Sequence, residues 1–123
     1  MSILGVGTDI IEIARVREVA ARQPRFMARV FTEAEIAHIE QGGEMKWARA
    51  AGKFAAKEAI AKAIGRPCSW RDIEVLPADN GRPTVVLRGR AAQAANGARV
   101  RLSISHSRDY TIAVAVLESE QAG

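Results

Sequence analysis

The stretch from Glu44 to Ile64, EMKWARAAGKFAAKEAIAKAI, decides the fold because it is long enough to form one central helix. It is rich in alanine and lysine, and Gly65 and Pro67 end it. On a helical wheel its residues fall on two roughly opposite, largely apolar stripes. One stripe holds Trp47, Ala51, Phe54, Glu58 and Lys62, and the other holds Ala56, Ile60, Ala63 and Ile64. This pattern predicts a helix that is buried on two sides.

Shorter elements are predicted on both sides of this helix. Apolar or alternating runs predict strands over residues 3–11, 73–76, 84–87, 99–105 and 111–117. Helices are predicted over residues 14–22 and 89–95, and a capping box at Thr32–Glu35 predicts another helix that starts near Glu33. The whole pattern predicts one α+β domain over residues 1–123, in which an antiparallel sheet packs against the long central helix and shorter helices.

Composition excludes several classes of protein. The chain has 123 residues and one cysteine, Cys68, which excludes an internal disulfide and a cysteine-rich zinc site. No apolar run approaches the roughly 18 residues of a membrane span, and the first residues lack the pattern of a signal segment. These features predict a cytoplasmic protein. The net charge of +4 favours an anionic partner, which could be a nucleic acid, a phosphate ligand or an acidic protein.

Asp9 and Glu58 are the candidate metal ligands. Gly5, Gly7 and Asp9 share one face of the first predicted strand, and glycines there indicate that something approaches the backbone. Glu58 is expected in partial burial, where Lys62 one turn on, a metal ion or protonation could compensate for its charge. Spacing alone favours the Glu58–Lys62 ion pair. Asp9 shifts the balance, because Mg²⁺ commonly binds one or two carboxylates together with water and substrate phosphates.

Each of the other charged or titratable candidate residues allows two interpretations. Lys57 and Lys62 flank Glu58 and could neutralise phosphate oxygens, although both could equally lie on a solvated face. His106 closes an apolar stripe at the end of a strand, where it either caps the core or reaches a site as a proton-transfer group or phosphate donor. His38 is predicted to be structural or exposed.

Three segments resemble the signature blocks of one family, in order and at fitting distances. They are GVGTDI (residues 5–10), FAAKEAIAKA (residues 54–63) and SISHS (residues 103–107). The chain resembles holo-acyl-carrier-protein synthase, the small class of 4′-phosphopantetheinyl transferases. The middle block is highly specific, and agreement over residues 25–32 and 80–83 extends the likeness over nearly the whole chain. Ser107 stands where the family often has threonine, which keeps the hydroxyl.

This resemblance implies a magnesium-dependent transfer of 4′-phosphopantetheine from coenzyme A to a serine of apo acyl carrier protein, with adenosine 3′,5′-bisphosphate released. Metal ligation is implied for Asp9 and Glu58, and catalytic roles for Glu58, Lys62 and His106. Whether Glu58 or a metal-bound water accepts the serine proton stays open. Cofactor contacts are expected from Lys53, Lys57, Lys62, Gly65, Asn80, Arg82, Pro83, His106 and Ser107.

The resemblance also implies partners. Small members of the family form homotrimers with coenzyme A bound between subunits. Arg15, Arg22 and Arg25 match the family's docking surface for the acidic acyl carrier protein, although a solvated basic face would carry the same residues. Two alternatives remain: a basic nucleic-acid-binding domain, which the six aromatic residues of the chain support poorly, and a non-catalytic trimer that binds coenzyme A.

Overall fold

The computed structural model describes residues 2–120, which build short helices and five strands around one long helix. The strands are β1 (Ile3–Glu12), β2 (Ile73–Pro77), β3 (Pro83–Leu87), β4 (Arg99–His106) and β5 (Tyr110–Glu118). The α-helices are α1 (Ile13–Arg22), α2 (Phe26–Val30), α3 (Glu33–Glu40), α4 (Lys46–Ile64) and α5 (Gly89–Ala95). Short 3₁₀ turns cover Gly43–Met45 and Trp70–Asp72.

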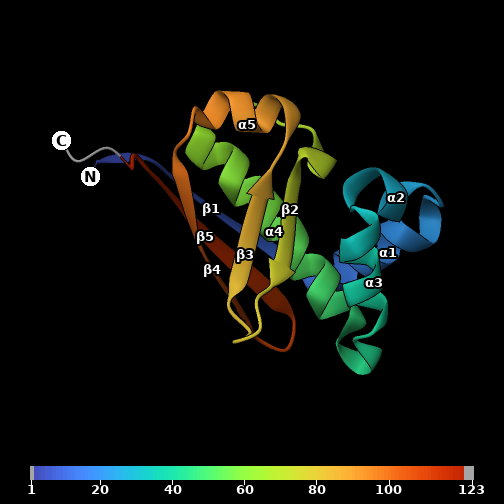
Figure 1. Cartoon of the computed structure of the whole chain (residues 1–123). Coiled ribbons are helices and arrows are strands. Elements are labelled where there is room, and N and C mark those ends of the chain that lie inside the picture. Colours follow the sequence, from blue (N-terminus) through green and yellow to red (C-terminus); the bar gives the residue numbers. More distant parts are fainter. Residues whose placement is uncertain (1, 121–123) are drawn as a thin grey trace.

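The strands divide into two antiparallel sheets. β1, β5 and β4 form a three-stranded sheet in that order, and β2 and β3 form a two-stranded hairpin. The long helix α4 lies between them, with α5 over one end of the molecule and α1, α2 and α3 gathered at the other (Figure 1). The predicted α+β class, antiparallel strands against a long central helix and shorter helices, is confirmed.

The core consists of two apolar clusters that meet on α4. The first joins the second half of α4 to both sheets: alanines 55, 56, 59 and 63 pack with Ala113 and Ala115 of β5 and with Ile73 and Val75 of β2. The second joins the first half of α4 to the small helices, and its members include Val16, Val30, Phe31 and Ile39. The helix is therefore buried on more than one side, as the two stripes predicted.

Two glycines let β1 pass close to α4. A Cβ atom on Gly5 would overlap the carbonyl oxygen of Ala63, and one on Gly7 would overlap the carbonyl oxygen of Ala59. The backbone that approaches these glycines is therefore a helix of the same chain, and the space beside them is not open to a ligand. The same contacts fix how far β1 slides along α4.

The small helices confirm one sequence signal and add one element that the sequence did not reveal. At the start of α3, the Thr32 hydroxyl accepts from the Glu35 N–H at 3.2 Å, and Glu35 Oε1 accepts from the Thr32 N–H at 2.8 Å. This confirms the capping box. The preceding helix α2 has only five residues, too few for a periodic pattern, and Phe26 at its start packs edge-on against Phe31 at 6.3 Å between ring centroids.

Candidate active site

Asp9 and Glu58 line one cleft because β1 and α4 run past each other in register. Gly5 abuts Ala63 and Gly7 abuts Ala59. Two residues of the strand therefore advance as far as four residues of the helix, since both segments are about 6 Å long. The next residue on this face of β1, Asp9, therefore lies beside the Ala55–Glu58 turn of α4. The cleft around the two carboxylates is lined further by Arg15, Phe54 and Tyr110.

The two carboxylates interact electrostatically. Burial raises the pKa of Glu58 above its usual range, the negative charge of Asp9 raises it further, and Lys62 partly opposes both. The Lys62 ammonium donates to the carbonyl oxygen of Thr8 at 3.0 Å and lies 3.5 Å from Asp9 Oδ1. The ion pair of Lys62 is thus with Asp9 on the neighbouring strand, whereas spacing alone had favoured Glu58.

This donor set fits a magnesium ion. Two carboxylates that repel each other in a half-buried cleft gain from a shared divalent cation. Within residues 2–120, no group of three or more His, Cys, Asp or Glu side chains could hold a metal. A two-carboxylate site leaves coordination positions for water and substrate phosphates, which is how Mg²⁺ is usually bound in phosphate-handling sites. Asp9 and Glu58 are the residues that would hold it.

A second pocket lies on another side of α4. Arg49 and Lys53 of α4 line it, together with the β2–β3 turn at Gly81 and Pro83 and the end of β4 at His106. Its remaining walls are largely apolar, and His38 of α3 completes them. His106 is exposed, so it does not cap the core. Because the pocket combines cationic groups with apolar walls, it suits a ligand that carries phosphate on an apolar body.

Lys53 is the most perturbed cation of this pocket. It is 5% exposed, and its ammonium donates to the carbonyl oxygen of Val75 at 2.8 Å. Burial lowers its pKa to about 8, with Glu35 opposing the shift and Lys57 adding to it. His38 lies beside it, and burial followed by the charges of Lys53 and Arg49 lowers the pKa of that imidazole.

Lys57 does not lie where the sequence placed it. It is 1% exposed, and its ammonium donates to Glu35 Oε1 at 2.8 Å, to the Trp70 carbonyl at 2.8 Å and to the Ile73 carbonyl. These three acceptors use its three N–H groups, so neither a solvated face nor a direct phosphate contact agrees with this position. The reason is helical geometry: Lys57 follows Lys53 by one turn on the face toward β2, away from Glu58.

The other predicted contact residues lie in turns. Asn80 accepts from the Arg82 N–H at 3.0 Å within the β2–β3 turn, and the Ser107 hydroxyl accepts from the Tyr110 N–H at 3.2 Å within the β4–β5 turn. Gly65 ends α4 with φ of +84°, a left-handed conformation that favours glycine. The local structure thus accounts for all three residues without a ligand.

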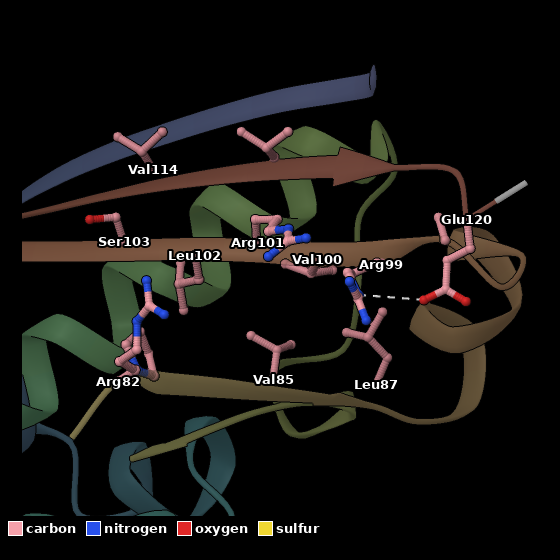
Figure 2. Close-up of a pocket in the computed structure, with 13 residues that line it drawn as sticks. Arg82, Val85, Leu87, Arg99, Val100, Arg101, Leu102, Ser103, Val114 and Glu120 are labelled. Atoms are coloured by element: carbon pink, nitrogen blue, oxygen red, sulfur yellow. Dashed lines mark ion pairs between the residues drawn. The ribbon is translucent and has the colours of Figure 1, made fainter. Parts of the chain in front are cut away.

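Arg82 lines a third hollow, the groove between β3 and β4 in Figure 2. Apolar side chains lie on both sides of it, Val85 and Leu87 on one and Val100 and Leu102 on the other. Arginines 82, 99 and 101 surround it, and Arg99 pairs with Glu120 at 3.5 Å. Arg82 is therefore separated from the Asp9–Glu58 cleft of the same chain.

The basic residues of the first two helices are exposed. Arg15 lies on the rim of the Asp9–Glu58 cleft, and Arg22 and Arg25 surround a shallow hollow with Phe26 and Arg29. Arg22 makes only a long surface ion pair with Glu18, at 3.9 Å. Exposed arginines therefore lie both beside the two carboxylates and around the end of α1 and the start of α2, and we call them the basic surface.

The comparisons agree with this geometry. A family model described as the 4′-phosphopantetheinyl transferase superfamily matches residues 5–115. The holo-[acyl-carrier-protein] synthase of Clostridium acetobutylicum is 46% identical over 122 residues, covering 94% of this chain and 98% of the relative. That of Moorella thermoacetica is 44% identical over 122 residues and covers 94% of both chains. The chain belongs to the holo-[acyl-carrier-protein] synthase family. It is therefore an enzyme, a phosphopantetheinyl transferase.

Solved structures of this family share the fold. The synthase of Plasmodium yoelii has a TM-score of 0.87 at 34% identity, over 98% of both chains. That of Bacillus anthracis, solved in complex with CoA (3′,5′-ADP), has a TM-score of 0.82 at 37% identity, over 96% of this chain and 98% of that one. Among residues 2–120 of this synthase, no helix is long and apolar enough to cross a membrane, and the cytoplasmic location stays a prediction.

The capping box predicted Glu35 only as a helix cap, and the structure gives it two further partners. It is fully buried, and besides capping α3 it accepts from Lys57 and from the Val75 N–H, each at 2.8 Å. The sequence held one usable signal, the capping box that fixes its place on α3. Nothing in the spacing indicated that a lysine 22 residues later would pair with it.

Proposed function

We propose that this enzyme transfers 4′-phosphopantetheine from coenzyme A to a serine of apo acyl carrier protein, with Asp9 and Glu58 holding Mg²⁺, and releases adenosine 3′,5′-bisphosphate. Residues 1–123 would act as one transferase domain. The observation that carries the proposal is the cleft in which the two carboxylates face each other with Lys62 beside them. Magnesium, when bound, offsets negative charge on the diphosphate. Lys62 would neutralise a phosphate oxygen, and the serine proton would pass either to Glu58 or to water.

The experiment is an intact-mass measurement of purified apo acyl carrier protein after incubation with the enzyme, coenzyme A and Mg²⁺. The expected result is a gain of one phosphopantetheine, absent with chelator and absent with the Glu58→Gln variant. A folded enzyme that modifies none of several apo carriers would contradict the proposal. A gain that survives both the chelator and Glu58→Gln would contradict the metal role alone.

The second pocket would bind the nucleotide end of coenzyme A. Lys53, Arg49 and His106 supply positive or donating groups, and Pro83 and its neighbours supply apolar surface. The nucleic-acid alternative has less support, because four of the six aromatic residues, Phe26, Phe31, Phe54 and Trp70, pack against each other. Phe54 stacks on Trp70 at 4.9 Å between ring centroids and also contacts Phe26.

An exposed apolar face supports a homotrimer with shared sites. Within the described chain, the Asp9–Glu58 cleft and the Lys53–His106 pocket have no lining residue in common, and a hollow that includes Glu12, Tyr110 and His106 adjoins both. On the outer face of the three-stranded sheet, the part formed by β1 and β5 is largely apolar and exposed: Val6 pairs with Val116 and Ile10 with Ile112. Such a face is typical of an interface between protein chains. A neighbouring copy could then bring its own second pocket to this carboxylate pair.

The basic surface on α1 and α2 would dock the acidic carrier. Reversing charge at Arg15 and Arg22 should raise the KM for the carrier about tenfold or more, because attraction between opposite surfaces speeds association, while the KM for coenzyme A stays within about twofold. Steady-state kinetics at low and high salt measure both constants. An unchanged carrier KM at low salt would contradict this docking surface. Arg90→Glu, on the distant helix α5, is the matched charge control.

A further inference from the structure

Side chains form hydrogen bonds with the backbone groups on the outer edge of β2, where a third strand would otherwise pair. The Arg88 N–H donates to the Asp72 carbonyl, so by alternation the even-numbered residues of β2 face β3, and Ile73 and Val75 face away. The outward groups of Ile73 and Val75 are all paired, and the Ile73 N–H donates to the Trp70 carbonyl. Lys57 donates to the Ile73 carbonyl, Glu35 accepts from the Val75 N–H, and Lys53 donates to the Val75 carbonyl.

These three side chains connect the hairpin to two helices. Lys53 and Lys57 lie one turn apart on α4, and Glu35 lies on α3. We call Lys53, Lys57 and Glu35 the clamp; their exposed fractions are 5%, 1% and 0%, and Lys53 alone of the three lines the second pocket. Charged groups this deep are costly unless they have partners: Lys57 and Glu35 form an ion pair, and Lys53 donates to a carbonyl oxygen. Their pairing selects one position of β2 along α4.

The clamp bears on the second pocket because the hairpin supplies one of its walls. Gly81 and Pro83 come from the β2–β3 turn, whereas Arg49 and Lys53 come from α4 and His106 from β4. In the described chain, β3 is not hydrogen-bonded to β4 as part of one sheet, so the hairpin edge does not fix this wall. Figure 1 shows the hairpin crossing in front of α4.

We propose that Lys57 and Glu35 are positioning residues for coenzyme A: they hold β2 against α4 so that the Ala78–Pro83 turn faces Lys53 and His106 across one pocket. This inference rests on the proposed function. Lys53 has two roles in this proposal. One of its N–H groups donates to the Val75 carbonyl, and its other N–H groups remain available to a phosphate. Neither Lys57 nor Glu35 lines the pocket, so both act through the backbone that they hold.

The test measures coenzyme A binding directly, by calorimetry without carrier protein. The variants are Lys57→Met, Glu35→Gln and the double variant Lys57→Met/Glu35→Leu, which removes both charges of the Lys57–Glu35 ion pair together. The dissociation constant for coenzyme A should rise about tenfold in each folded variant. The Val75 amide should exchange with solvent at least about tenfold faster in the double variant, because its acceptor is gone.

Leu117→Ala is the matched stability control. Leu117 is a buried apolar residue of the three-stranded sheet and does not belong to the clamp. Its truncation should therefore lower Tm and leave the dissociation constant for coenzyme A within about twofold. A folded double variant with wild-type affinity would overturn the positioning role. Failure of the wild-type enzyme to bind coenzyme A would instead overturn the proposed function.

Discussion

The charge of Lys53 is poised to change at mildly alkaline pH. Its folded-state pKa is lowered to about 8, whereas the unfolded-state value stays near the usual 10.5. Between these values the folded chain binds fewer protons than the unfolded chain, so this lysine makes the protein more stable as pH rises. Phosphate binding responds in the opposite direction, because the deprotonated amine no longer attracts an anion.

We therefore expect the KM for coenzyme A to rise above pH 8, by up to about tenfold per pH unit. Lys53→Arg should flatten this profile, because a guanidinium stays charged over the whole range. Steady-state kinetics from pH 6.5 to 9.5, with the carrier at saturation, measure the effect. A wild-type profile as flat as that of Lys53→Arg would mean that Lys53 does not meet the phosphate.

Glu58 costs stability when no cation is present. Its pKa is raised by burial and by Asp9, so its deprotonation destabilises the fold as pH rises from the unfolded-state pKa through the folded-state pKa. At neutral pH, Glu58→Gln should raise Tm in the presence of chelator, while transfer falls about 100-fold or more.

Added Mg²⁺ should raise the Tm of the wild-type enzyme and leave that of Glu58→Gln unchanged, since a ligand stabilises only the state that binds it. Thermal unfolding with and without Mg²⁺ measures both effects. An equal rise in the two proteins would place the ion elsewhere.

At the scale of elements, the contact between β1 and α4 builds the carboxylate pair. Gly7→Ala should push the strand from the helix, because the new Cβ would overlap the Ala59 carbonyl oxygen. We expect a loss of about 1–3 kcal/mol in the free energy of unfolding and loss of the Mg²⁺-induced rise in Tm. Gly52→Ala is the control.

At position 52, the new Cβ would meet Ile104 at 3.5 Å and Thr111 at 3.7 Å, which are ordinary contacts. Because Gly52 lies inside α4, alanine there should stabilise the protein by about 0.5–1 kcal/mol. Denaturant unfolding compares the two variants. Similar effects at both positions would show that the close approach of β1 to α4 is not what Gly7 provides.

The sequence predicted the elements that depend on local signals. The capping box at Thr32, the glycine stop at Gly65 and the alternation on β1 are each encoded within a few residues, and the structure confirms them. The division into two sheets and the pairing of Lys57 with Glu35 depend on contacts between distant segments, which periodicity does not encode. Lys57 was misplaced for that reason, whereas the face shared by Gly5, Gly7 and Asp9 could be read directly.

At the scale of the whole molecule, the exposed apolar face of the three-stranded sheet is the feature that a single chain leaves unexplained. Val6 is 62% and Ile10 is 64% exposed, and both belong to the strand that carries Asp9. A solvent-facing sheet normally alternates apolar residues inside with polar residues outside. Here the outward face of β1 carries Leu4, Val6 and Ile10, which fits a strand covered by α4 on one side and by another copy of the chain on the other.

We expect the proposed trimer to dissociate into monomers when Val6→Lys is combined with Ile10→Lys, because each charge would have to be desolvated in the interface. Transfer activity should fall with it, since the second pocket of the neighbour would leave the carboxylate pair. Light scattering coupled to size-exclusion chromatography measures the mass. Val86→Lys, which places the same charge at a 44% exposed valine on the β2–β3 hairpin, should change neither mass nor activity. A double variant that stays fully active as a monomer would show that one chain holds a complete site.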